Sequence, residues 1–481
     1  MAKKKDSSVT GEVLDFEEEK KRLKEELDRE AELNDLDLSI FSDTEKLDEM
    51  NAKHAFINSV GGKPMVLCHT YSVVANRKII EFRSPESIMM QYSNQTMSIG
   101  NSIIPLGNWW IRNADRKEYE TVIFDPEKGQ EYKNCLNLWE GLTVEPIKGC
   151  WKITLKHLYK ILCNRDRDKF KYVIKWFAWS IQNPGTRAEV AVIFKGKQGA
   201  GKGFIFTQFV QIFGQHGLHI SNRKHLTGDF NGHMQICSFL FADEAYYPGD
   251  KEVEGAINQL ISEPLLAIEA KRQNVTIAKN CLHIGMATNA EWVIPATGDT
   301  RRYFINEVDN TYAKNQCPDA VRNDYFHALW GEMNEGGREA MVYDMKKMDL
   351  NGWHPRADIP DTEEFVKQVS ISLDRFKQSI LEFIDAGEFP GEKVDIEYFK
   401  VNAKVLIDFY ENLSPANKKI QPKRRSDLFK LIGAEKKRSS DGNFYVFPSL
   451  KTVKFNYIQN INRHQKFDNL EDEWIVTKHS Y

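Results

Sequence analysis

The spacing of apolar residues changes several times along this 481-residue chain. Residues 1–52 are dominated by charge, and Leu23, Leu27 and Ala31 follow at helical spacing, which predicts one exposed helix on a flexible arm. A short coiled coil is the alternative. Residues 53–150 contain short β-prone runs broken by glycine, proline and asparagine, which predicts a small N-terminal α/β module.

Three tryptophans in that module, Trp109, Trp110 and Trp139, allow two interpretations. Aromatic faces can stack on the bases of a single strand without sequence preference. Large aromatic side chains also dominate the core of any small domain. We favour the core for all three.

Residues 151–185 have the apolar period of a helix, and the run ends at Asn183-Pro184-Gly185, so a helical collar is expected here. Four apolar residues share one face of it: Val173, Ile174, Phe177 and Ile181. Residues 186–345 then alternate apolar strands with helical stretches, which is the pattern of a parallel sheet in an α/β domain.

The strand candidate at residues 191–194 leads directly into a glycine loop and then into a helical stretch. Glycines let successive backbone N–H groups approach phosphate oxygens, and the helix N-terminus adds its positive dipole end. We predict that Lys202 neutralises the β and γ phosphates of ATP. Gly203 departs from the general G-x-x-x-x-G-K-[ST] motif, whose last hydroxyl serves Mg²⁺. The predicted nucleotide-binding residues are Gly196, Gln198, Gly199, Ala200, Gly201, Lys202, Gly203 and Phe204.

Two further strand candidates end in polar residues. The first ends in Asp243 and Glu244, where one carboxylate can hold Mg²⁺ and the next can activate water. The second ends in Asn289, whose amide could touch the γ phosphate. Arg301 and Arg302 follow a loop with glycine and proline, and an arginine finger of this kind can contribute about 10³ to 10⁵ in rate at a neighbouring subunit's nucleotide.

In their order and spacing, these motifs resemble the superfamily 3 helicases, in particular the C-terminal helicase halves of phage and poxvirus-type primase-helicases. The resemblance is carried by residues 176–302. It implies a P-loop, AAA+-like fold and a hexameric ring, with Mg²⁺ held largely through water and Asp243. Asn289 would occupy the sensor position, and glycine after the loop lysine is common in phage members.

The resemblance also implies a basic β-hairpin that grips nucleic acid in the central channel of the ring. Residues 268–279 offer two β-prone arms around a polar turn. Lys271, Arg272 and Lys279 would contact phosphates rather than base edges. The alternative is an exposed hairpin with a solvated charge cluster.

After a linker at residues 346–380, residues 381–462 offer helices followed by a hairpin, the order of a winged helix. Ser426 is a good N-cap for the last helix, and Asp441-Gly442 is a strong turn signal. Duplex DNA contact is expected there, with a solvated basic face as the alternative. Its candidate residues are Lys423, Arg424, Arg425, Lys437 and Arg438. Residues 463–481 read as an acidic tail.

The net charge of −3, from 66 basic and 69 acidic residues, requires any nucleic-acid surface to be local. Seven cysteines without a C-x-x-C pair predict neither disulfides nor a zinc site. Without a signal peptide or an apolar membrane-spanning run, we expect no membrane association and a cytoplasmic protein, encoded by a phage or mobile element in a bacterial host.

The sequence therefore predicts an ATP-dependent replicative DNA helicase that forms a homo-hexamer and acts on single-stranded and forked DNA with ATP and Mg²⁺. Residues 1–150 are too few for a polymerase domain and a linker module, so a separate primase is a further expected partner. A replication initiator that binds an origin is the main alternative. An ATPase that senses nucleic acid for defence or packaging is a third.

Overall fold

The computed structural model describes residues 21–22, 24, 39–74, 77–99, 102–228, 231–244, 251–269, 274–291, 293, 301–372, 375–390, 392–393, 399–413, 422–440, 442–461, 465, 467 and 473–477. Two compact units make up the chain, Met1–Val122 and Ile123–Tyr481. The helix expected around Leu23 and Leu27 lies outside the described residues. None of the described helices is long and apolar enough to cross a membrane.

The first unit contains both helices and strands. Its main sheet has the order β3-β2-β1-β6, in which only β1 and β6 run parallel. Trp110 is fully buried, and its Nε1–H donates to Asn51 Oδ1 at 2.9 Å, so it belongs to the core. The elements are α2 (Ser39–Lys53), β1 (His54–Val60), β2 (Lys63–Ser72), β3 (Arg77–Arg83), α3 (Pro85–Gln91), β4 (Thr96–Ile99), β5 (Ser102–Pro105), α4 (Leu106–Arg112) and β6 (Glu118–Tyr119).

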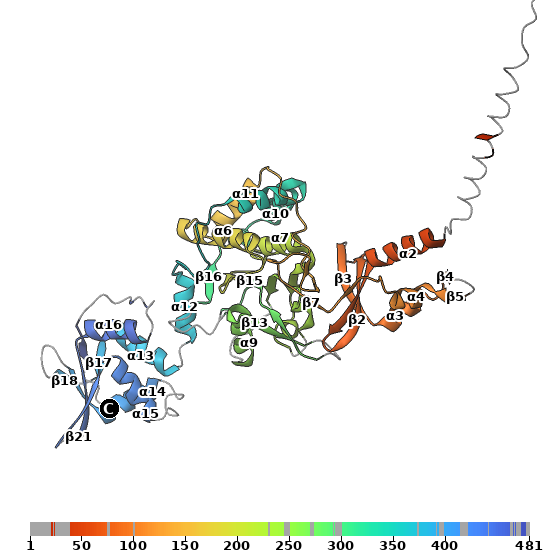
Figure 1. Cartoon of the computed structure of the whole chain (residues 1–481). Coiled ribbons are helices and arrows are strands. Elements are labelled where there is room, and N and C mark those ends of the chain that lie inside the picture. The colour runs from red at the N-terminus through yellow and green to blue at the C-terminus, as the bar shows by residue number, and fades with distance from the viewer. Residues whose placement is uncertain are drawn as a thin grey trace, which may run out of the picture. The chain divides into compact units, whose positions relative to one another are not determined.

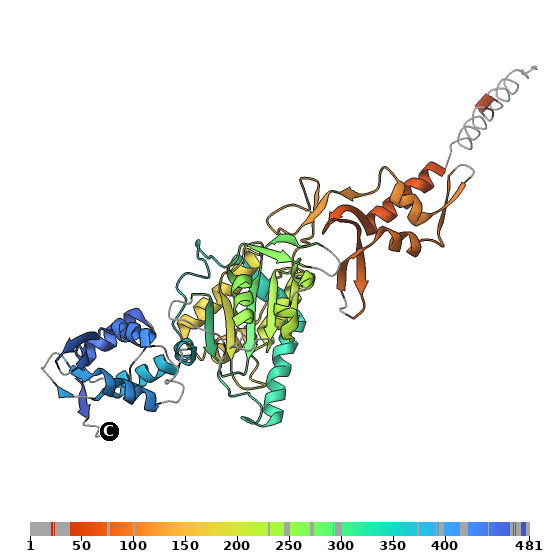
Figure 2. The same cartoon turned by 90° about the horizontal axis from the view of Figure 1, so that it is seen from below.

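The second unit is built on a five-stranded parallel sheet with the order β11-β12-β15-β10-β16, and Figure 2 shows these strands side by side. Each strand is a short apolar run, as expected for a sheet buried on both faces. The strands are β10 (Ala191–Lys195), β11 (Gly217–Ile220), β12 (Phe239–Asp243), β15 (His283–Thr288) and β16 (Tyr303–Glu307).

Alternate residues of these strands enter two different cores, because successive side chains of a strand point to opposite faces. Val192 and Phe194 pack with helices α6, α7, α10 and α11, which lie together in Figure 1. Ala191 and Ile193 pack on the other face, with α8, α9 and α12. The helices are α6 (Arg167–Gln182), α7 (Phe204–Phe213), α8 (Arg223–Thr227), α9 (Lys251–Ser262), α10 (Asp319–Glu332), α11 (Arg338–Lys347) and α12 (Glu363–Ser372).

The predicted collar is present as α5 (Lys152–His157), the π-helix η1 (Leu158–Leu162) and α6. All four predicted apolar residues of α6 are buried, and Asn183 caps its C-terminus. A kinked segment, η4 (Met333–Gly337), joins α10 to α11, and Gly336 in it has a φ of 97°. Short 3-10 turns, η2 (Gly214–His216) and η3 (Gly232–Met234), precede β11 and β12 respectively.

The structure differs from the sequence prediction on both sides of this domain. Residues 123–150 belong to the second unit and contribute β8 (Glu131–Tyr132) and β9 (Cys135–Asn137), beside β7 (Thr121–Ile123). In the predicted linker, α12 packs against β16, and Lys195 Nζ donates to the buried carboxylate of Glu364 at 2.8 Å. Long-range contacts hold these segments in the parallel-sheet domain. The spacing of apolar residues along the sequence does not reveal such contacts.

The predicted hairpin is present as the antiparallel pair β13 (Leu265–Ile268) and β14 (Thr276–Lys279). Farther along, a helix, a strand, two helices, a hairpin and a fourth helix share one core of their own. The third of these helices begins at Pro422, not after Ser426, since proline suits the first turn of a helix. The elements are α13 (Arg375–Ala386), β17 (Glu388–Pro390), β18 (Glu392–Lys393), β19 (Phe399–Asn402), α14 (Ala403–Leu413), α15 (Pro422–Leu431), β20 (Glu435–Ser439), β21 (Gly442–Phe447), α16 (Leu450–Asn460) and β22 (Ile475–Thr477).

Candidate functional site

Three neighbouring strands, β12, β15 and β10, end at one edge of the parallel sheet, and each continues into a predicted site residue. Their tips are tied by backbone hydrogen bonds. Gly196 N–H donates to Thr288 O at 3.1 Å, and Glu244 N–H donates to Ala287 O at 2.9 Å. The crevice outside the carboxyl ends of such strands is where open α/β sheets bind their ligands.

The loop between β10 and α7 depends on its glycines. Gly199 and Gly201 have φ values of +80° and +88°, in the left-handed region that favours glycine. A Cβ on Gly201 would lie 2.7 Å from Cε1 of His157, and one on Gly196 would lie 2.7 Å from Cγ2 of Val308. The backbone therefore turns tightly here and leaves no room for side chains on its inner side.

His157 of α5 supports this loop from beneath, although no sequence motif marked it. Its Nε2–H donates to Gly201 O at 3.2 Å, since a carbonyl can only accept, and its Nδ1 accepts from the Tyr325 hydroxyl at 2.8 Å. Burial lowers the pKa of His157 to about 4. The imidazole is therefore neutral near pH 7 and links the loop to α10.

Lys202 is held inside the loop rather than extended into solvent. Its Nζ donates to the carbonyls of Gly196 and Lys197, both at 2.8 Å. Burial lowers the pKa of Lys202, while the charges of Glu244 and Asp243 act in the opposite direction. These carboxylates at the tip of β12 thus lie within electrostatic reach of the loop lysine.

The two carboxylates have different settings. Asp243 is the last residue of β12, and its Oδ2 lies 3.6 Å from Nε2 of His219, a residue that the sequence analysis missed. His219 stacks on Phe241, with ring centroids 4.5 Å apart. Glu244 is exposed and has a φ of 52°, uncommon for a residue with a side chain. Strained backbone of this kind is frequent at functional sites.

Three further residues of the predicted nucleotide loop are closely packed against their neighbours. Ala200 and Phe204 are buried, and the Phe204 ring lies edge-on to Trp330. Gly203 has no room for a side chain because a Cβ there would lie 2.9 Å from Cζ of Phe241. The packing of β12 against the loop explains why glycine replaces the usual Ser or Thr.

Asn289 is exposed just beyond the tip of β15, the strand that pairs with β12 next to Asp243. The two arginines lie elsewhere. Arg302 precedes β16, and its carbonyl accepts from Ala191 N–H at the amino end of β10. Since five strand residues span about 16 Å, the arginines lie at the sheet edge opposite the glycine loop. Arg301, Arg302 and Arg356 line a pocket of about 480 Å³ there.

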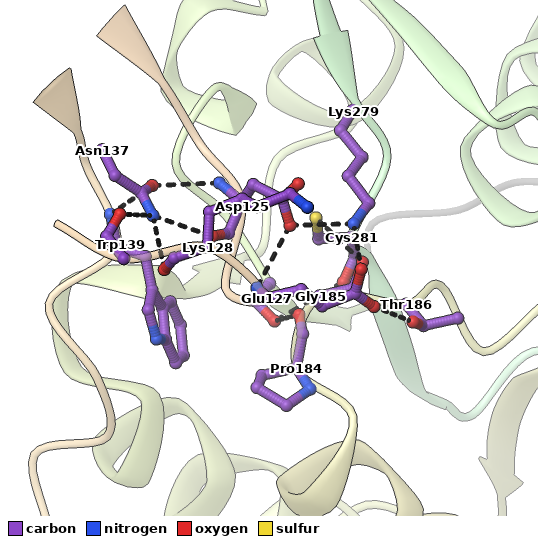
Figure 3. Close-up of polar contacts among 12 residues, drawn as sticks. Asp125, Glu127, Lys128, Asn137, Trp139, Pro184, Gly185, Thr186, Lys279 and Cys281 are labelled. Atoms are coloured by element: carbon purple, nitrogen blue, oxygen red, sulfur yellow. Dashed lines mark hydrogen bonds and ion pairs between the residues drawn. The ribbon is translucent and has the colours of Figure 1, made fainter. Parts of the chain in front are cut away.

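The structure gives Lys279, at the end of β14, a role that differs from the predicted phosphate contact. Its Nζ lies 2.8 Å from Asp125 Oδ1 and 2.9 Å from Glu127 Oε2 (Figure 3). Burial acts to lower the pKa of Lys279, but hydrogen bonds to both carboxylates raise it overall. The lysine joins the hairpin root to the segment before the collar. Lys271 and Arg272 lie outside the described residues.

That segment is itself rigidly organised by one buried amide. Asn137 Nδ2 donates to three carbonyls, those of Asp125, Lys128 and Gly129, at 2.8 to 3.1 Å, while its Oδ1 accepts from Asp125 N–H (Figure 3). Glu127 also accepts from the Thr186 hydroxyl at 2.7 Å. These hydrogen bonds therefore hold the segment that carries Asp125 and Glu127 in place independently of Lys279.

The basic residues proposed for duplex contact lie in α15 and the β20–β21 hairpin. Lys423, Lys437 and Arg438 are exposed, and Lys437 pairs with Glu435 of its own strand at 3.2 Å. Arg424 and Arg425 belong to α15, but their side chains lie outside the described part of the structure. These three exposed side chains are accessible to solvent, as a contact with a phosphate backbone would require.

A protein-only metal cage is not the expected form of the Mg²⁺ site. The described residues contain no group of three or more His, Cys, Asp or Glu able to hold a metal ion. Mg²⁺ typically takes one or two carboxylates together with water and substrate phosphates. Asp243, with part of its side chain exposed beside Lys202, fits that donor set.

Comparison with known proteins connects this region to phage proteins. A family described as "Family of unknown function (DUF5906)" matches residues 194–302. Over 187 residues the chain is 26% identical to the "DNA Primase-polymerase" of Nitratiruptor phage NrS-1. The match covers 38% of this chain and 26% of that protein, so the chain matches about a quarter of the relative's length.

Solved structures extend the likeness beyond this region. An apo structure of the NrS-1 C-terminal region has a TM-score of 0.53 at 19% identity, covering 70% of this chain and 76% of that one. The A form of the same region has a TM-score of 0.55 at 16% identity, covering 79% and 96%. At such identities the likeness establishes a shared fold, a mixed α/β arrangement with a parallel sheet.

Proposed function

We propose that this chain is an ATP-driven motor of phage-type DNA replication, with an AAA+-like P-loop domain that works as a ring helicase on single-stranded DNA. The observation that carries the proposal is that the neighbouring tips of β10, β15 and β12 bring the glycine loop that holds Lys202 to the same sheet edge as Asp243 and Glu244. Similarity to a DNA primase-polymerase supports a role in replication.

Each residue at this edge then has a distinct task in ATP hydrolysis. Two N–H groups of Lys202 hold the loop carbonyls, which leaves the third for a β or γ phosphate oxygen. Asp243 would hold Mg²⁺, largely through water, and the ion would supply neutralisation of the charge that develops on the phosphates. Glu244 orients or deprotonates the attacking water, and Asn289 contacts the γ phosphate.

Substitution of the two central residues tests this proposal. Lys202→Ala and Glu244→Gln should each abolish DNA-stimulated ATP hydrolysis, while Glu244→Gln still binds nucleotide. Lys197→Ala is the matched control, because Lys197 is an exposed lysine of the same loop whose backbone N–H and carbonyl, rather than its side chain, bond to Asn310 and Lys202. Full hydrolysis by either central variant would contradict the assignment.

A replication initiator is the second candidate, and the C-terminal basic elements favour it. Their order of helix, strand, two helices and hairpin supports the winged-helix prediction, and the group has a separate core. Removing residues 375–481 separates the two functions. Loss of duplex binding with intact strand separation on forked DNA supports the helicase, whereas loss of all unwinding supports the initiator.

A further inference from the structure

The collar contains a pocket that the proposed ATP site does not use. It measures about 550 Å³, within the range of about 300 to 1,000 Å³ typical of small-ligand sites. Three partly buried residues form its apolar floor, and four exposed cations surround them. The floor consists of Leu155, Tyr159 and Phe170, and the cations are Lys152, Lys156, Arg167 and Lys171.

The floor offers aromatic surface that is anchored in the domain. Phe170 and Leu155 pack against the main core, and the rings of Tyr159 and Phe170 meet edge to face with centroids 5.4 Å apart. This contact restrains both rings. A restrained aromatic ring suits stacking against the face of a nucleobase.

The rim is strongly positive. No carboxylate lines the described part of the pocket, and the rim residue Lys171 forms only a loose ion pair, with exposed Asp168 at 3.7 Å. Four like charges around one opening repel each other unless an anion is shared. The charge therefore complements a polyanion.

The pocket and the phosphate loop lie on different faces of one helix. Lys152, Leu155, Lys156 and Tyr159 have the i, i+3, i+4, i+7 spacing of a single helical face. His157, about 100° farther round than Lys156, turns to Gly201 of the loop. The pocket is consequently a separate site that shares its supporting helix with the loop.

We propose that this collar pocket binds single-stranded DNA, with one base on the Tyr159 and Phe170 surface and neighbouring phosphates on the four cations. Aromatic residues inside a cationic groove are the arrangement that binds single strands without sequence preference. An acidic peptide would use the cations but not the ring surface. The inference rests on the proposed work on single-stranded DNA and adds a second contact to it.

Equilibrium binding of a fluorescent oligo-dT to the full chain, without nucleotide and at several salt concentrations, tests the pocket. Lys156→Glu should weaken binding about tenfold. Lys156→Ala should reduce the slope of log K against log salt by about 0.7, the value for one phosphate contact on a single strand. Lys160 is an exposed lysine of the same helical segment that lies outside the pocket lining. Lys160→Glu should therefore leave the affinity and the salt slope unchanged.

An abasic strand of equal length tests the aromatic floor. The parent should bind oligo-dT about fivefold or more tightly than the abasic strand, and Tyr159→Leu should reduce that difference. The proposal would be overturned if Lys160→Glu lost as much affinity for oligo-dT as Lys156→Glu, or if Lys156→Glu bound oligo-dT as tightly as the parent. Equally tight binding of a polyglutamate peptide of matched charge would also overturn it.

The two proposals can fail separately. If Lys202→Ala hydrolyses ATP normally while Lys156 still controls oligo-dT binding, the motor assignment fails and the pocket stands. If ATP hydrolysis requires Lys202 but binding is indifferent to Lys156, only the pocket fails. Lys202 lies in the loop and Lys156 is exposed. Thermal unfolding of each variant at these two positions checks that the chain is folded.

Discussion

At the scale of single residues, Gly203 shows how core packing can select the residue in a glycine-rich loop. Serine here would gain a few tenths of a kcal/mol as an N-cap of α7. Its Cβ, however, would lie 2.9 Å from Cζ of Phe241, a buried ring of β12. Overpacking of that kind costs about 1 to 3 kcal/mol, so the steric term should win and Gly203→Ser should destabilise the domain.

A double-mutant cycle in urea unfolding measures this effect. Phe241→Leu removes the opposing ring edge and should recover part of the stability lost in Gly203→Ser, a coupling of about 1 kcal/mol. Phe209→Leu changes another buried ring of the same core that does not approach Gly203. Additive behaviour in the Phe241 pair, as expected for the Phe209 pair, would rule out the contact as the reason for glycine.

His157 makes the stability of the domain depend on pH. Burial lowers its pKa from 6.5 to about 4 in the folded chain. Between these values the unfolded chain binds more protons, so the stabilisation is complete above pH 6.5 and is lost as the pH falls towards 4. The loss at pH 5 relative to pH 7 is about 2 kcal/mol from this group.

Urea unfolding of the full chain at pH 7 and pH 5 checks the sign. His157→Gln can keep both hydrogen bonds without titrating, so its stability should change less between the two pH values by about 2 kcal/mol. His327→Gln alters an exposed histidine of α10 and is the matched control. An identical pH dependence in the parent and His157→Gln would show that the loop histidine is not the responsible group.

At the scale of elements, the polar residues at the ends of strands could be predicted from the sequence. The contacts between distant residues that hold these strand ends in place could not. β10, β12 and β15 are apolar runs followed by a loop or carboxylate, so their residues carry a local signal. The sheet order that makes them neighbours, the His157 contact and the packing of α12 on β16 depend on residues far apart in the chain. Lys279 illustrates the same difficulty. Its position in the sequence suggested a contact with a nucleic-acid phosphate, whereas its partners in the structure are carboxylates about 150 residues earlier in the chain.

The contact between Lys279 and the Asp125 segment should hold the root of the β13–β14 hairpin. Lys279 is one-third exposed, so the paired network contributes about 1 kcal/mol to local stability. Lys279→Met should therefore speed hydrogen exchange of the hairpin amides about fivefold. Lys279→Arg keeps a cation within reach of both carboxylates and should remain close to the parent. Equal protection in Lys279→Met would mean that backbone pairing alone fixes the hairpin.

At the scale of the whole molecule, the opposed places of Lys202 and the arginines suggest that a complete ATP site needs two subunits. The arginines lie at the far edge of their own sheet, about 16 Å from the loop. In the proposed ring, head-to-tail contacts would bring one subunit's far edge to the next subunit's loop. The arginine finger predicted from sequence, Arg301 or Arg302, would then act at the neighbouring subunit's nucleotide.

Mixing two inactive variants tests the shared site. Lys202→Ala and a chain with both Arg301→Ala and Arg302→Ala should each lose ATP hydrolysis, because every interface lacks one partner. In a random equal mixture, about one interface in four joins an intact loop to intact arginines, so about a quarter of the parent rate should return. Recovery requires subunit exchange, which a mixture of parent and Lys202→Ala monitors independently. No recovery despite exchange would place the arginines outside the ATP site.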